Sequence, residues 1–154
     1  GYTGNNYFVV GGVTSPTIKL QSTTGPAAWD IYSAGGLDLF LGYNAVDKGQ
    51  FSRTTGAYTA LSDANKKKDF EPSNIGLAEV LKLKPTLFRM IGAADDSSKE
   101  LGFVAQDVQS VIPQAYVEAE SQGGKFIGLQ DRPIIAALTR AIQELTARVE
   151  ALEA

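Results

Sequence analysis

A serine and a lysine lie five residues apart in segment 61–69, near the middle of the chain. The hydroxyl of Ser62 is a candidate nucleophile, and the amine of Lys67 is a candidate base that would accept its proton. A lysine accepts a proton only when it is neutral, and desolvation or neighbouring cations favour that form. Lys66 and Lys68 are such cations. Spacing alone does not distinguish a Ser–Lys dyad from a solvated charged linker.

The absence of two residue types limits any other chemistry. The chain contains no histidine and no cysteine. A Ser-His-Asp or Cys-His pair, a His/Cys zinc site and a disulfide are therefore excluded. Covalent chemistry would have to use Ser, Thr or Lys, with Lys or a carboxylate as the base. We expect no cofactor and no metal.

Size and charge exclude further classes of protein. The chain has 154 residues and a net charge of −3, which is unsuited to neutralising nucleic-acid phosphates. Apolar runs such as Ile134–Leu138 are too short to span a bilayer core of about 30 Å. We therefore expect neither a nucleic-acid partner nor a membrane partner.

The composition changes near residue 61. Residues 1–61 contain six charged residues and ten of the sixteen glycines, whereas residues 62–154 contain the other 25 charged residues. A shift of this size in a short chain predicts two structural regions, 1–61 and 62–154, with the Ser62 segment between them.

The first region has the pattern of short β-strands separated by turn residues. Strands this short, in so few residues, cannot bury much apolar surface. We therefore expect the region to need either chain upstream or further copies of itself, and a small independent β-domain is the alternative. The candidate strands are Tyr7–Val10, Thr17–Leu20, Ala28–Tyr32, Leu37–Leu41 and, in pieces, Phe51–Ala60.

The second region alternates helix and strand patterns, so the predicted fold class of the whole chain is α+β. Ser73 and Asn74 are candidate N-caps of its first helix, and Pro85 ends that helix. The candidate helices are 75–81 and 106–111, and the candidate strands are 86–90, 101–105, 116–118 and 126–129.

The last segment, 131–153, predicts the longest helix. Asp131 is a candidate N-cap, and Pro133 is tolerated in the first turn. Apolar residues recur at heptad a and d positions, a pattern that favours two strands in parallel model coiled coils. A lone helix of this length is marginal in water, so the stripe must pack against other copies or against the chain's own globular part. The stripe is Ile135, Leu138, Ile142, Leu145, Val149 and Leu152.

Several motifs of the second region occur together in one order. Ser62, Asp63 and Lys67 open it, and Gly102–Val108 followed by Ile112-Pro113 forms its most distinctive block. With these motifs the region resembles the C-terminal intramolecular chaperone domain of phage tailspikes and tail fibres, also classed as an endosialidase-type self-cleaving peptidase. Further matching segments are Gly76–Leu81, Lys84–Phe88 and Ala141–Leu145.

This resemblance implies both an assembly role and a reaction. Members of the family gather three fibre chains as an intertwined homotrimer, set their register and are then cut off. Carried onto this chain, the cut falls between Leu61 and Ser62, with Ser62 as nucleophile and Lys67 as base. The reaction is a single turnover without an external substrate, and the heptad helix belongs to the trimer.

Two positions depart from the family pattern. Asn65 lies where the family usually has Arg, and Lys66 lies where it usually has an apolar residue. A trimerisation cap that stays attached is therefore one alternative function. A receptor-binding fibre tip with a C-terminal scaffold is another.

The resemblance also implies partners and a location. Residues 1–61 would lie in the virion tail fibre beside the upstream fibre chain, and the chaperone part would act in the host cytoplasm during assembly. Trp29, Tyr32 and Tyr43 could stack on host surface glycans. The alternative is that these aromatics are packing residues of the β stem.

Overall fold

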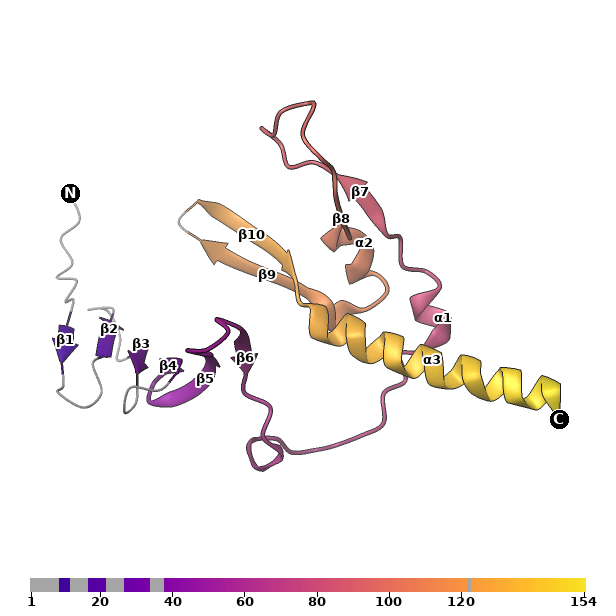
Figure 1. The fold of residues 1–154 in the computed structure, drawn as a ribbon, viewed down its shortest axis with the longest axis horizontal. Helices are drawn as coiled ribbons and strands as arrows, with labels where there is room; N and C mark the ends of the chain where they lie inside the picture. The colour runs from indigo at the N-terminus through magenta and orange to yellow at the C-terminus, as the bar shows by residue number, and fades with distance from the viewer. Residues whose placement is uncertain (1–8, 12–16, 22–26, 34–37, 122) are drawn as a thin grey trace. The chain divides into compact units, whose positions relative to one another are not determined.

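The computed structural model describes residues 9–11, 17–21, 27–33, 38–121 and 123–154. The chain forms two compact units, Gly1–Phe70 and Glu71–Ala154 (Figure 1). Small antiparallel sheets and three α-helices in the described residues confirm the predicted α+β class. Tyr7, Phe8 and Leu37 belong to two predicted strands and lie outside the described residues.

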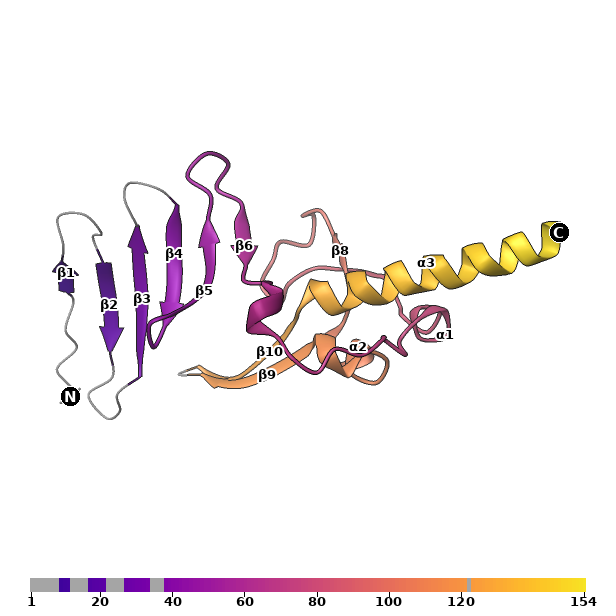
Figure 2. The same cartoon turned by 90° about the horizontal axis from the view of Figure 1, so that it is seen from below.

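The first unit is a six-stranded antiparallel meander in which every strand pairs with its neighbour in sequence (Figure 2). Each pairing is therefore a local hairpin, which the short alternating strands favour. The strands are β1 (Val9–Gly11), β2 (Thr17–Gln21), β3 (Ala28–Ser33), β4 (Leu39–Tyr43), β5 (Val46–Phe51) and β6 (Tyr58–Ala60).

Strand β5 is absent from the sequence-based prediction, because its centre is polar and the turn before it lacks glycine. Asn44 and Ala45 form that turn with φ values of 51° and 61°. Asn44 tolerates this left-handed conformation better than Ala45 does. The Asn44 N–H also donates to the Ala28 carbonyl at 3.0 Å, and the Asn44 Oδ1 accepts from the Ala28 N–H at 3.0 Å.

Replacing Ala45 with glycine is expected to stabilise the β4–β5 hairpin by about 0.5–1 kcal/mol, because a Cβ is strained in the left-handed region. Slower hydrogen exchange at the β5 amides would measure the gain. Ala57→Gly is the matched control, since Ala57 is not among the described residues with positive φ. Faster exchange in Ala45→Gly than in the unchanged chain would contradict the prediction.

The two faces of this sheet differ in chemistry. Cross-strand register puts Leu20, Trp29, Tyr43 and Val46 in one row on the same face. Further rows complete this apolar face, which comprises Ile18, Leu20, Trp29, Ile31, Leu39, Leu41, Tyr43, Val46, Phe51 and Tyr58. The opposite, polar face comprises Thr17, Lys19, Asp30, Tyr32, Phe40, Gly42, Asp47, Gln50 and Thr59.

The sheet has almost no core of its own. Among its described residues only Ala28, Gly42 and Gly49 are buried. Large side chains of the apolar face, such as Leu20, Trp29 and Phe51, remain 37–52% exposed. A face this apolar calls for a covering layer, which agrees with the expectation that residues 1–61 need a partner.

The second unit contains the predicted helices and strands with shifted ends. Helix α1 begins at Leu77 rather than near Ile75, because the Gly76 N–H donates to Glu79 Oε2 at 3.1 Å and Gly76 is the N-cap. Strands β7 and β8 pair with each other, as do β9 and β10. The elements are α1 (Leu77–Val80), β7 (Thr86–Phe88), β8 (Glu100–Gly102), α2 (Ala105–Gln109), η2 (Pro113–Ala115), β9 (Tyr116–Ser121), β10 (Gly124–Leu129) and α3 (Asp131–Glu153).

The core of this unit is small and lies between α2, η2 and the start of α3. Val108 and Ile112 are its largest fully buried side chains. Ala115, Ile134 and Ala137 complete the buried cluster, with Phe103 and Leu129 among the partly buried residues around it. The core therefore anchors only the first turns of α3.

One carboxylate on α3 holds α1 in place. Glu144 Oε2 accepts the Leu77 N–H at 3.1 Å, and Glu144 Oε1 accepts from Arg140 Nε at 2.8 Å. The carboxylate sits so close to Gly76 that an added Cβ would lie 2.5 Å from Oε1. The Leu77 N–H and, after it, Arg140 lower the pKa of Glu144 below its usual value, because both stabilise the charged form.

Replacing Glu144 with glutamine is expected to lower the unfolding midpoint at pH 7. A depressed pKa in the folded state means that the stabilisation is complete above the ordinary value of 4.5 and is lost as pH falls through the folded pKa. The gap between Glu144→Gln and the unchanged chain should therefore close towards pH 3 in thermal melts. Glu150→Gln on the same helix is the control. An equal gap at both pH values would contradict this account.

Helix α3 carries two separate apolar stripes. Ile134, Ala137 and Ala141 are buried, and the first two belong to the unit's core cluster. The six heptad residues from Ile135 to Leu152 lie on another side and are 40–88% exposed. The helix begins with Asp131 as its first residue and Gln130 as its N-cap, so the predicted capping role of Asp131 is wrong. Beyond Glu144 every helix residue is exposed.

Candidate cleavage site

The chain makes a tight turn directly after Ser62. Asp63 begins the short 3-10 helix η1 (Ala64–Lys66), and its Oδ1 accepts the Asn65 N–H at 2.9 Å. The Lys67 N–H closes the turn on the Ala64 carbonyl at 3.0 Å. This side-chain-capped turn reverses the chain, so residues on either side of it can meet.

The turn brings together the two predicted catalytic side chains. Lys67 Nζ donates a hydrogen bond to Ser62 Oγ at 2.8 Å. That separation is within the range of about 2.6–3.2 Å over which a base takes a proton from a nucleophile. A neutral Lys67 at the same distance would accept the Ser62 hydrogen, so the geometry suits nucleophile activation.

The predicted scissile bond is tied to the end of the sheet. The Leu61 N–H donates to the Lys48 carbonyl at 3.0 Å, which extends the pairing of β5 with β6 by one residue. The main chain on the acyl side of the Leu61–Ser62 bond is therefore fixed by β5. Sequence analysis did not find Lys48, because a main-chain contact depends on strand register and carries no residue-type signal.

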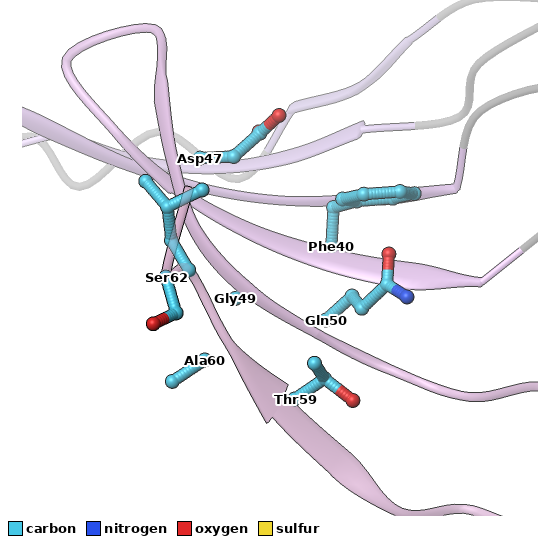
Figure 3. Close-up of a pocket in the computed structure, with 8 residues that line it drawn as sticks. Phe40, Asp47, Gly49, Gln50, Thr59, Ala60 and Ser62 are labelled. Atoms are coloured by element: carbon cyan, nitrogen blue, oxygen red, sulfur yellow. The ribbon is translucent and has the colours of Figure 1, made fainter. Parts of the chain in front are cut away.

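A hollow of about 290 Å³ adjoins Leu61 and Ser62. Figure 3 shows Phe40, Gln50 and Thr59 on one side of it and Ala60 and Ser62 on the other. All of its lining residues come from β4, β5, β6 and the two residues that follow β6. The Leu61 side of the predicted scissile bond therefore lies beside a hollow that residues of the sheet line.

The dyad of the single chain lies in water. Every residue from Leu61 to Phe70 is exposed. Water weakens the electrostatic interactions on which acyl transfer depends and keeps an amine charged. The contact between Ser62 and Lys67 is therefore formed in the single chain, whereas a water-excluded environment is not.

The two departures from the family pattern occupy the turn itself. Asn65 Nδ2 donates to Asp63 Oδ1 at 3.1 Å, beside the bond from the Asn65 N–H to the same oxygen. Asn65 therefore reinforces the turn in this chain. Lys66 is the last residue of η1 and lines a small hollow with Leu61 and Asp47.

The distinctive block from Gly102 onward serves packing. Val108 and Ile112 are the largest buried side chains of the second unit. At Gly102 an added Cβ would come within 3.1 Å of the Phe88 ring, so the residue permits a close β7–β8 pairing. These residues therefore build the fold of the second unit.

The three aromatic residues singled out for glycan stacking do not share a surface. Trp29 and Tyr43 form a tilted pair on the apolar face with ring centroids 5.1 Å apart. Tyr32 lies on the polar face and stacks on Phe40 at 5.4 Å. No single stacking site therefore contains all three.

Two absences hold for the residues that the structure describes. No helix among them has the length and apolar character needed to cross a membrane. They also contain no group of three or more carboxylate side chains able to hold a metal ion.

One known protein family matches the segment that begins at Ser62. The family described as "chaperone of endosialidase" matches residues 62–116, so the match begins at the proposed nucleophile. The resemblance seen in the sequence is confirmed. The part that matches this chaperone family contains the Ser62 turn, the β7–β8 hairpin, α2 and much of the small core.

The chain is also similar to curated long tail fibre proteins of phages. Long tail fibre protein Gp37 of Enterobacteria phage K3 is 36% identical over 96 residues, which is 60% of this chain and 8% of that protein. Gp37 of phage T2 is likewise 36% identical over 96 residues, and Gp37 of phage M1 is 29% identical over 90 residues. The chain spans 7–8% of the first two and 35% of the third. No solved structure matches the chain.

Proposed function

We propose that residues 62–154 are an intramolecular chaperone that gathers three copies of a phage tail fibre chain and is then released by cutting the Leu61–Ser62 bond. Residues 1–61 are the fibre segment that remains. The observation that carries the proposal is the 2.8 Å contact between Lys67 Nζ and Ser62 Oγ at the first residue of the family match.

The proposed reaction uses only groups of this chain and water. Ser62 Oγ attacks the Leu61 carbonyl carbon while Lys67 takes the hydroxyl proton. The C–N bond breaks as the Ser62 nitrogen takes a proton, leaving an ester between the Leu61 acyl group and Ser62 Oγ. Water then hydrolyses the ester, giving a Leu61 carboxylate and restoring the Ser62 hydroxyl. Each chain reacts once.

Assembly supplies what the single chain lacks. The heptad stripe of α3 is exposed, and burying each of its six residues would contribute roughly 1.5–3 kcal/mol. Bringing copies together costs about 4–15 kcal/mol of free energy per association. Burial of one heptad stripe per chain is large enough to offset that cost. In this proposal the assembled copies also exclude water from Lys67, so that cutting follows correct assembly.

The fibre segment, residues 1–61, depends on the chaperone associating first. Its sheet buries almost nothing alone, so it has little free energy with which to hold separate chains together. A chaperone that associates first holds the fibre segments of the three chains at a high local concentration. Once the chaperone has left, the fibre persists because its unfolding is slow.

Mass spectrometry of the purified full chain tests the proposal. We expect two species, residues 1–61 with a free C-terminal carboxylate and residues 62–154 with a free Ser62 amine. A single species of all 154 residues, in a preparation whose native mass is three chains, would favour the alternative of a cap that stays attached. That alternative draws support from the exposure of the dyad and from Asn65 in place of the family's Arg.

A further inference from the structure

The polar face of the sheet contains a second hollow, which shares Asp47 with the hollow beside Leu61 and Ser62. Cross-strand register puts Lys19, Asp30, Gly42 and Asp47 in one row over four strands, β2 to β5. The hollow has a volume of about 390 Å³. It is lined by Thr17, Lys19, Asp30, Tyr32, Gly42, Ala45 and Asp47.

Gly42 forms the floor of this hollow. It is buried, and a Cβ added to it would lie 3.7 Å from Asp30 Cβ and 3.8 Å from Tyr32 Cε1. Those are ordinary packing distances, so a larger side chain would fill the space between Asp30 and Asp47. The glycine therefore keeps the space between the two carboxylates free for a ligand.

One carboxylate has a hydrogen-bond partner, and the other has only an ion-pair partner. Tyr32 Oη donates to Asp47 Oδ1 at 2.6 Å, which fixes that carboxylate and raises the pKa of Tyr32 to about 12. Asp30 is only 14% exposed, and its Oδ1 is enclosed without accepting any hydrogen bond in the described part of the chain. Lys19 Nζ is 3.6 Å from that oxygen, close enough for charge balance but too far for a hydrogen bond. The part of the Asp30 side chain that stays accessible lines the hollow, where a ligand hydroxyl can approach it.

The lining groups select one class of ligand. Two carboxylates beside one ammonium leave a net negative charge, which disfavours an anion. The described residues offer no group of three metal ligands, and the charged lining disfavours an apolar ligand. Hydroxyl groups fit best, because they donate to Asp30 and Asp47 and accept from Lys19. The volume suits a small ligand of one or two sugar rings.

The position of the hollow keeps it open in an assembled fibre. The opposite face carries the apolar rows and is the one that other copies must cover. Covering the polar face instead would bury Lys19, Asp30 and Asp47 at a high desolvation cost. The hollow therefore faces outward when the copies pack through their apolar faces.

We propose that the polar face of β2–β5 binds an uncharged saccharide, held between Asp30 and Asp47 over the bare main chain at Gly42, with Lys19 donating to a ring or hydroxyl oxygen. This inference rests on the proposed place of residues 1–61 in the fibre and is independent of cleavage.

An array of uncharged, amino and acidic oligosaccharides tests the proposal, with the purified full chain as the probe. We expect binding to uncharged saccharides, confirmed in solution by calorimetry with the strongest of them. Asp30→Asn and Asp47→Asn should each weaken that binding at least tenfold. Gly42→Val, which fills the hollow without changing charge, should do the same.

Asp38→Asn is the matched control, because Asp38 lies outside the hollow and accepts the Arg53 N–H instead. Its binding should equal that of the unchanged chain. The native mass of every variant is recorded in parallel, so that a loss of assembly, which counts against the proposed function, is told apart from a loss of binding. Binding to amino saccharides alone, to acidic saccharides alone or to none, or full binding in both aspartate variants, would overturn the proposal.

Discussion

Replacing Ser62 with alanine is expected to leave the purified chain whole, with no trace of a species ending at Leu61. Alanine removes the oxygen that attacks, and loss of a nucleophile lowers such rates by about 10³-fold or more. Lys67→Met should have the same effect, because it removes the only side chain that hydrogen-bonds Ser62 Oγ in the described residues. Intact mass after purification measures both results.

Lys67→Arg separates the role of a base from that of a cation. Arginine keeps the positive charge but does not become neutral in proteins, so this variant should also stay whole. Lys66→Arg and Lys68→Arg are matched controls, because they keep the cations on either side of Lys67, and both should still be cut. Cleavage that persists in Lys67→Arg would show that Lys67 acts only through its charge.

Placing a charge in the exposed heptad stripe is expected to abolish both assembly and cleavage. Leu145 is 50% exposed in the single chain and has no partner within its own unit's core. Leu145→Asp would bury a carboxylate at the proposed helix contact, at a cost of several kcal/mol per chain. We expect the native mass to fall to that of one chain, and the polypeptide to remain whole, because the dyad stays in water.

Ala147→Asp is the control for this variant. It adds the same charge to the same helix but lies outside the heptad stripe, so assembly and cleavage should both persist. If Leu145→Asp were cut as fast as the unchanged chain while running as a monomer, assembly would have no part in activating Lys67. The cutting and the gathering of chains would then be separate properties.

The parts of this fold that follow local rules were predictable. The α3 helix repeats its apolar residues with one period, and the hairpins of the first unit alternate with another. Strand β5 escaped prediction because Asn44-Ala45 is an unusual two-residue turn and the strand's centre is polar. The start of α1 was misplaced because Glu144, far away in sequence, binds the Leu77 N–H.

The candidate site was predictable for a different reason. The spacing of Ser62 and Lys67 alone favoured a solvated linker, and only the family motif selected a dyad. The turn capped by Asp63 explains why that spacing works, since it folds Lys67 back onto Ser62. The saccharide hollow had no local signature, because it depends on register that aligns Asp30, Gly42 and Asp47 on three different strands.

The heptad pattern did not show which side of α3 packs within its own unit. Ile134, Ala137 and Ala141 form the stripe that packs within the unit, one position away from the predicted stripe. Small residues at two of these three positions let the helix approach its core closely. The predicted stripe is thereby left free for contacts with other chains.

The native mass of the uncut Ser62→Ala chain, followed over a dilution series, tests the central claim most directly. The account requires copies to assemble through residues 62–154 before any bond is cut. It therefore predicts a stable species of three chains that Leu145→Asp reduces to single chains. A folded Ser62→Ala monomer that persists at every concentration would contradict it.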